Sequence, residues 1–144
     1  MRANMELTQK FALAYSSACR PLCRELGLTR TAFDILLFLA NNPSYKTARD
    51  IVEVRHIKAN LVSVNVDRLV REGYLMRQPV AGDRRKTELV CTPQAQDAIC
   101  RGRQLQEMFF DRLLDGMDDG MRLQLLTALE TISKNLDARL KEAE

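Results

Sequence analysis

The side chains most suited to chemistry in this sequence are one histidine, His56, and four cysteines. A single histidine rules out a multi-histidine metal site and a histidine-based catalytic dyad. The sequence also has no nucleophile–base pair, phosphate-binding loop or metal-ligand spacing. We therefore expect no enzyme activity, no metal and no cofactor. The first residues lack the apolar core of a signal peptide, so we expect a cytoplasmic protein whose cysteines are free thiols.

Positive charge is concentrated in one part of the chain. The formal net charge is only +3, yet the segment from Arg55 to Lys86 holds eight basic and three acidic residues, a net charge of +5. The remainder of the chain has a net charge of −2. A basic middle segment between slightly acidic ends indicates one surface that binds a polyanion. The basic residues are Arg55, Lys58, Arg68, Arg71, Arg77, Arg84, Arg85 and Lys86.

The elements that position this charge are mostly helices. With 144 residues, of which 46% are hydrophobic, the chain suits a single soluble domain, and no window approaches the ~20 apolar residues of a membrane span. Apolar periodicity predicts helices at about 6–26, 30–40, 47–55, 58–72, 93–116 and 118–142, and strands at 74–79 and 87–91. A charged loop, 80–86, would join the two strands.

Three threonines are placed to cap predicted helices. Thr29 precedes a helix that is apolar on nearly every side, Thr47 is followed three residues later by Asp50, and Thr92 precedes a proline. The last predicted helix has a narrow apolar seam, which favours packing against a partner helix. The seam residues are Leu125, Leu129, Ile132, Leu136 and Leu140.

Two short helices joined by a tight turn and followed by a basic two-stranded ribbon form the winged helix-turn-helix pattern of DNA-binding proteins. The second helix of the pair would enter the major groove. There Asn60 suits adenine, Ser63 a base or a phosphate, and Val64 a thymine methyl group, whereas Arg55 and Lys58 suit phosphates. The alternative for Asn60 and Ser63 is an ordinary helix surface.

Two carboxylates are expected to orient cations in this region. Asp67 would repel a phosphate and is expected to pair with Arg71, four residues later on the same helix, and so to orient Arg71, which is itself expected to contact DNA. In the wing, Asp83 is expected to hold one guanidinium while further cations enter a minor groove, where narrow A·T-rich DNA attracts arginine. The alternative is a solvated charged hairpin. The wing cations are Arg84, Arg85 and Lys86.

The run from Leu28 to Ala95 resembles the MarR family of winged-helix regulators. The residues that carry the match are Gly27 to Thr29, Asn60 to Leu69, Glu72 to Leu75, the wing motif Gly82-Asp83-Arg84-Arg85-Lys86, and Leu89 to Pro93. The family often has glycine where this chain has His56, and histidine tolerates the left-handed conformation better than most residues.

The resemblance implies a mainly α fold with a small two- or three-stranded β wing. Residues 1–144 would be a single MarR-like domain, with the winged helix-turn-helix at 28–95 and dimerisation helices at 5–27 and 93–144. It also implies that Arg85, two residues after the wing aspartate, enters the minor groove. The partners would be a second copy of the chain and a pseudo-palindromic operator in double-stranded DNA, without any membrane.

The predicted function is therefore that of a sequence-specific transcription regulator, a repressor released by a small-molecule effector or by thiol oxidation. Some relatives sense oxidants through a cysteine near Cys19 and Cys23, although buried structural cysteine is the alternative for this pair. The alternative function is a winged-helix module that contacts other proteins without binding DNA.

Overall fold

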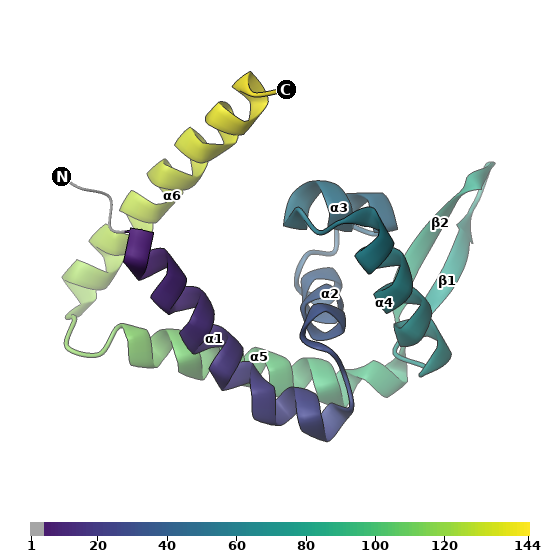
Figure 1. Ribbon diagram of the computed structural model, residues 1–144, viewed down its shortest axis with the longest axis horizontal. Helices are drawn as coiled ribbons and strands as arrows, with labels where there is room; N and C mark the ends of the chain where they lie inside the picture. Colours follow the sequence, from purple (N-terminus) through teal and green to yellow (C-terminus); the bar gives the residue numbers. More distant parts are fainter. Residues whose placement is uncertain (1–4) are drawn as a thin grey trace. The chain divides into compact units, whose positions relative to one another are not determined.

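The computed structural model describes residues 5–144, and the chain separates into two compact units, residues up to 107 and residues 108–144. The boundary falls inside α5. In chain order the elements are α1 (Met5–Leu26), α2 (Arg30–Asn41), α3 (Ala48–Arg55), α4 (Ala59–Arg71), β1 (Leu75–Val80), β2 (Asp83–Cys91), the 3₁₀ turn η1 (Pro93–Ala95), α5 (Gln96–Leu113) and α6 (Asp119–Glu142). Figure 1 labels these helices and strands along the chain.

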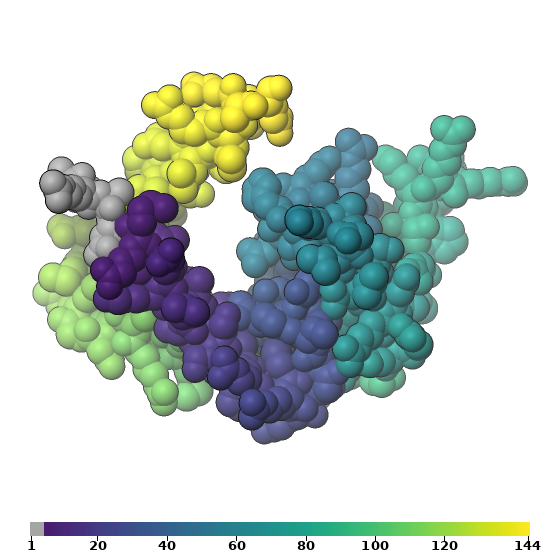
Figure 2. Space-filling view, viewed as in Figure 1, coloured from purple at the N-terminus to yellow at the C-terminus, as the bar shows by residue number. Residues whose placement is uncertain are grey.

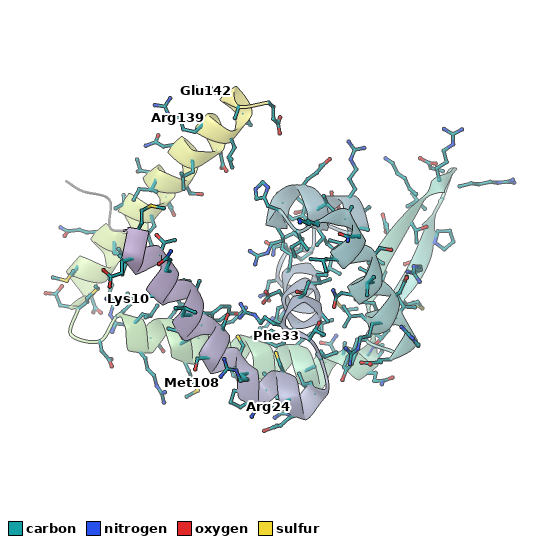
Figure 3. All side chains as sticks on the ribbon, viewed as in Figure 1. Lys10, Arg24, Phe33, Met108, Arg139 and Glu142 are labelled. Carbon is teal, nitrogen blue, oxygen red and sulfur yellow. The ribbon has the colours of Figure 1, made fainter. Side chains whose placement is uncertain are left out.

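The core of the first unit is built around α2, which packs against α1, α4 and β2. Thr29 caps this helix as predicted, because its side chain accepts a hydrogen bond from the backbone N–H of Ala32. Leu28, just before the cap, and Phe33, at the fourth helical position, are both buried, as a hydrophobic staple requires. Phe33 is labelled in Figure 3. The apolar sequence of α2 therefore becomes a helix surrounded by protein.

The α3 to α4 segment is the helix-turn-helix. Thr47 and Asp50 form a complete capping box at the start of α3. At the end of α3 His56 has a φ of +53°, in the left-handed region, as the sequence allows. The chain then enters α4 after Lys58, whose side chain makes no capping hydrogen bond. This turn sets the start of the helix that carries the predicted base-reading residues.

The wing is an antiparallel hairpin of two strands, β1 and β2. Regular pairing runs from Leu75 opposite Cys91 to Pro79 opposite Thr87, after which Val80 pairs with Asp83. Residues 84–86 therefore have no partner on β1 and form a bulge in β2. The predicted charged loop 80–86 is wrong: only residues 81 and 82 form the turn, because Gly82 accepts the positive φ that a tight turn needs, and β2 begins directly at Asp83.

The start of α5 also differs from the prediction. The Thr92 side chain does not cap a helix. Its hydroxyl instead donates to the carbonyl oxygens of Gly73 and Tyr74, so it ties the end of β2 to the segment between α4 and β1. One 3₁₀ turn follows, and α5 begins only at Gln96.

The second unit contains α6, a helix predicted at about 118–142. The Asp118 side chain caps it by accepting a hydrogen bond from the backbone N–H of Met121. The helix has no buried residue. Within residues 5–144, no helix has both the length and the apolar character that crossing a membrane requires. The large exposed apolar side chains of α6 are Met121, Leu123, Leu126, Leu129, Ile132, Leu136 and Leu140.

Candidate nucleic-acid interface

The second helix of the helix-turn-helix, α4, is sharply divided into an inner and an outer face. Val62, Val66 and Leu69 are buried against the core. The predicted base-reading residues are all exposed: Asn60, Ser63 and Val64, the last with 65% of its surface accessible. An exposed valine between polar neighbours on a surface helix offers an apolar contact without contributing to the core of the unit.

The basic residues of the segment from 55 to 86 fall into two groups. Arg68 forms an ion pair with Glu72, and Arg77 forms one with Asp67. The other six are exposed, and none has a carboxylate of residues 5–144 within ion-pair distance. These six are the basic residues predicted to contact DNA: Arg55, Lys58, Arg71, Arg84, Arg85 and Lys86. The structure thus leaves their charge available to an external polyanion.

The partner of Asp67 is not the predicted one. Its carboxylate accepts a hydrogen bond from the Arg77 guanidinium of β1 rather than from Arg71 of its own helix. The predicted pair on one helix is wrong because the wing packs against α4 and brings Arg77 to the carboxylate. The ion pair joins α4 to the wing and leaves Arg71 without an ion-pair partner among the described residues.

At the wing, Asp83 and the bulge that follows it form a compact local structure. The Asp83 carboxylate accepts the backbone N–H of Arg85 at 3.0 Å, and no guanidinium of the described residues lies within ion-pair distance of it. The predicted ion pair between Asp83 and an arginine side chain is therefore wrong, and Asp83 forms an Asx-type turn instead. The turn bonds a backbone N–H two residues along the chain, so it does not require a long side chain to be ordered. Figure 2 shows the end of the hairpin standing clear of the rest of the first unit.

A groove of about 520 Å³ lies behind α4, between α3 and the base of the wing. Its apolar lining includes Val52, Val62 and Leu89, and Ser63 and Arg77 are among its polar residues. α4 still packs against α3 beside this groove, and the Asp67–Arg77 ion pair adds a polar contact between α4 and the wing.

The two cysteines proposed as redox sensors are both buried, Cys19 completely and Cys23 to 7% exposure. Burial raises the pKa of each thiol, and the nearby Arg30 guanidinium only partly opposes this effect. Tyr15 also hydrogen-bonds the Cys19 thiol and lowers its pKa. A buried thiol with a raised pKa has little thiolate at neutral pH, so these surroundings favour the structural alternative.

Sequence reasoning missed two residues of this region. Arg77 was counted among the basic residues but given no role, because its partner lies ten residues away on another element. Asn65 was included only in the run from Asn60 to Leu69 that resembles the MarR family, and it was given no role of its own. In the structure its side chain is buried, with 7% exposure. A signal was present: Asn65 falls between Val62, Val66 and Leu69 in the helical period, on the inward face.

Comparisons with known proteins agree with this geometry. Residues 26–86 match the model of the MarR family. The transcriptional regulator PA3341 is 26% identical over 92% of this chain and 96% of its own, with a TM-score of 0.79. The regulator SlyA is 19% identical, with 99% of this chain and 100% of its own covered and a TM-score of 0.85.

A MarR-family regulator from Listeria monocytogenes, crystallised with a 26mer DNA, is 18% identical over 94% of this chain and 90% of its own, with a TM-score of 0.84. No curated protein matches the chain. The fold is therefore the winged-helix fold of these regulators, and the resemblance to the MarR family seen in the sequence motifs is confirmed for residues 26–86.

Proposed function

We propose, starting from the MarR-family identity of residues 26–86, that this chain is a transcription regulator that binds a specific sequence of double-stranded DNA as a homodimer. The observation that carries the proposal is the set of six exposed cations without ion-pair partners, which span the end of α3, α4 and the wing. Arg55, Lys58 and Arg71 would neutralise phosphates and set the register of the protein on the duplex.

Sequence preference would come from the outer face of α4. Asn60 can make a bidentate contact to adenine, Ser63 can bond a base or a phosphate, and Val64 can pack on a thymine methyl group. From the wing, the bulge at 84–86 would direct cations toward the minor groove, with Arg85 as the residue that enters it. The winged helix-turn-helix would thus occupy residues 28–95.

The dimer would be formed by the terminal helices, residues 5–27 and 93–144. The support lies in α6, a helix of 24 residues with no buried residue among those described and an apolar seam along its length. Exposed leucine and isoleucine at three- and four-residue spacing suit a helix of a second copy. Ile132→Glu should convert the dimer to monomer in analytical ultracentrifugation, and a monomeric wild type would remove this part of the proposal.

For release from DNA, a small ligand is better supported than thiol oxidation. A cavity of about 440 Å³ in the first unit is lined by Arg20, Arg24 and Arg30 together with the apolar side chains of Cys23 and Leu28. Such a site suits a compact organic anion with an apolar body. Arg24, on α1, is labelled in Figure 3. We infer a cytoplasmic repressor whose operator affinity falls when this ligand binds.

The function is tested by selecting duplexes from a random-sequence library with the wild-type protein. We expect the selected sequence to be a pseudo-palindrome that binds at least about 10³-fold more tightly than a scrambled duplex at fixed salt. Asn60→Ala should reduce this preference, while Arg139→Ala on α6 should leave it unchanged. If the library yields no preferred sequence, the module that contacts other proteins becomes the better reading of the fold.

The ligand part is tested on the selected duplex. Small carboxylic acids added to the wild-type complex should release DNA, and Arg24→Glu should abolish the release without changing DNA affinity in their absence. Release by peroxide that a thiol reductant reverses would instead support oxidation at Cys19 or Cys23.

A further inference from the structure

One polar side chain interrupts the apolar contact between α2 and α4. Asn65 is the buried polar residue of the described chain, among neighbours such as Val62, Val66 and Leu69. An asparagine buried at such a position requires partners for both its amide groups, because an unsatisfied group loses its hydration without compensation.

Asn65 has both partners, and together they connect two helices. The hydroxyl of Thr29 donates to Asn65 Oδ1 at 2.8 Å, and Asn65 Nδ2 donates to the backbone carbonyl oxygen of Leu61 at 2.8 Å. Thr29 Oγ1 also accepts the backbone N–H of Ala32 at 3.0 Å. A continuous chain of hydrogen bonds therefore runs from the N-terminal backbone of α2 to the backbone of α4.

This chain of bonds fixes the rotation of α4 about its own axis. Apolar side chains tolerate small rotations, but a rotation that separates Thr29 from Asn65 leaves the buried Oδ1 of Asn65 without its hydrogen bond. Outer side chains lie about 5–6 Å from the axis of a helix, so a rotation of about 20° moves them by about 2 Å. That displacement is enough to lose a hydrogen bond to a base edge.

We propose that Thr29 and Asn65 are positioning residues for base reading: they touch no DNA, but their hydrogen bond sets the rotation of α4 that presents Asn60 and Ser63 to the major groove. The inference rests on the proposed DNA-binding function. It predicts that loss of the bond lowers the preference for the specific sequence, while phosphate contacts, which tolerate small displacements, remain.

The experiment compares binding of the duplex selected by the wild type with binding of a scrambled duplex of the same length. Thr29→Val and Asn65→Leu each remove the bond while keeping the number and branching of the side-chain heavy atoms, and each should lower the ratio of the two affinities about tenfold. The double variant should be no worse than either single variant, because both remove the same interaction. Thr29→Ser keeps the hydroxyl and should keep the wild-type ratio. The slope of scrambled-duplex affinity against salt should not change.

A matched control separates positioning from general stability. Leu37→Ala removes buried apolar contacts of α2 near Gly102 of α5 but leaves the Thr29–Asn65 hydrogen bond in place, so it should leave the ratio unchanged. All variants are compared below their unfolding midpoints. If the affinity ratios of Thr29→Val and Asn65→Leu stay within about twofold of the wild-type ratio, the positioning role is wrong, although the proposed DNA-binding function is unaffected. If the wild type itself prefers no duplex, the proposed function fails, and the positioning role with it.

Discussion

Replacing Arg85 by alanine removes one exposed cation from each wing, and therefore two from the proposed dimer. Arg85 lies in the bulge of β2, and no described carboxylate forms an ion pair with its side chain, so its charge is not neutralised within the subunit. Each phosphate neutralised by the protein contributes a slope of about −0.9 to the dependence of log affinity on log salt concentration. The slope of the variant should be shallower by about 1.8.

The loss of affinity follows from the same relation. Two released contacts correspond to a weakening of about 200-fold at about 50 mM salt and about 30-fold at about 150 mM salt, from the counterion term alone. The quantity to measure is the dissociation constant of the wild-type-selected duplex over this range, for example by fluorescence anisotropy. The ratio between variant and wild type must shrink as salt rises.

The matched control is Arg139→Ala. Arg139 is an exposed cation of α6 that pairs with Glu142 at 3.1 Å, so the variant loses the same formal charge from another part of the chain (Figure 3). It should keep the wild-type slope. Equal slopes for wild type and Arg85→Ala would refute the contact, and an equal change in both variants would attribute the effect to net charge alone.

Three further outcomes are expected. His56→Gly should raise the free energy of unfolding by about 0.5–1 kcal/mol, because glycine adopts the positive φ without strain; urea denaturation measures it, and a loss of stability would contradict the strain. Gly102→Val should lower the melting temperature through about 1–3 kcal/mol of overpacking, since an added Cβ lies 2.9 Å from Leu37 Cδ2, and Leu37→Ala should restore part of the loss. Because burial raises the pKa of Cys19 and Cys23 in the folded state, their contribution to stability is present at pH 7 and is lost as pH rises above the ordinary thiol value of 9.0. Urea midpoints between neutral and alkaline pH should fall less in a Cys19→Ala/Cys23→Ala variant, and parallel profiles would count against the raised pKa.

Local signals in the sequence were sufficient for most of the secondary structure. Thr29, and Thr47 with Asp50, act within three residues along the chain, so their capping roles were readable without coordinates. The same holds for the buried α2, whose apolar residues surround the helix, and for the turn at His56. The concentration of cations between residues 55 and 86 is likewise a property of the sequence, and it led to the six residues that are exposed and have no ion-pair partner within residues 5–144.

Tertiary structure alone decided which polar groups meet. Asp67 had a suitable partner four residues away, yet packing of the wing on α4 gave it Arg77. Thr29 and Asn65 are 36 residues apart, and nothing in helical periodicity indicates that their side chains share a hydrogen bond. Periodicity specifies the direction in which a side chain leaves its own helix or strand, whereas an ion pair or a buried hydrogen bond depends on the distance between two such elements, which is set by how the whole core packs.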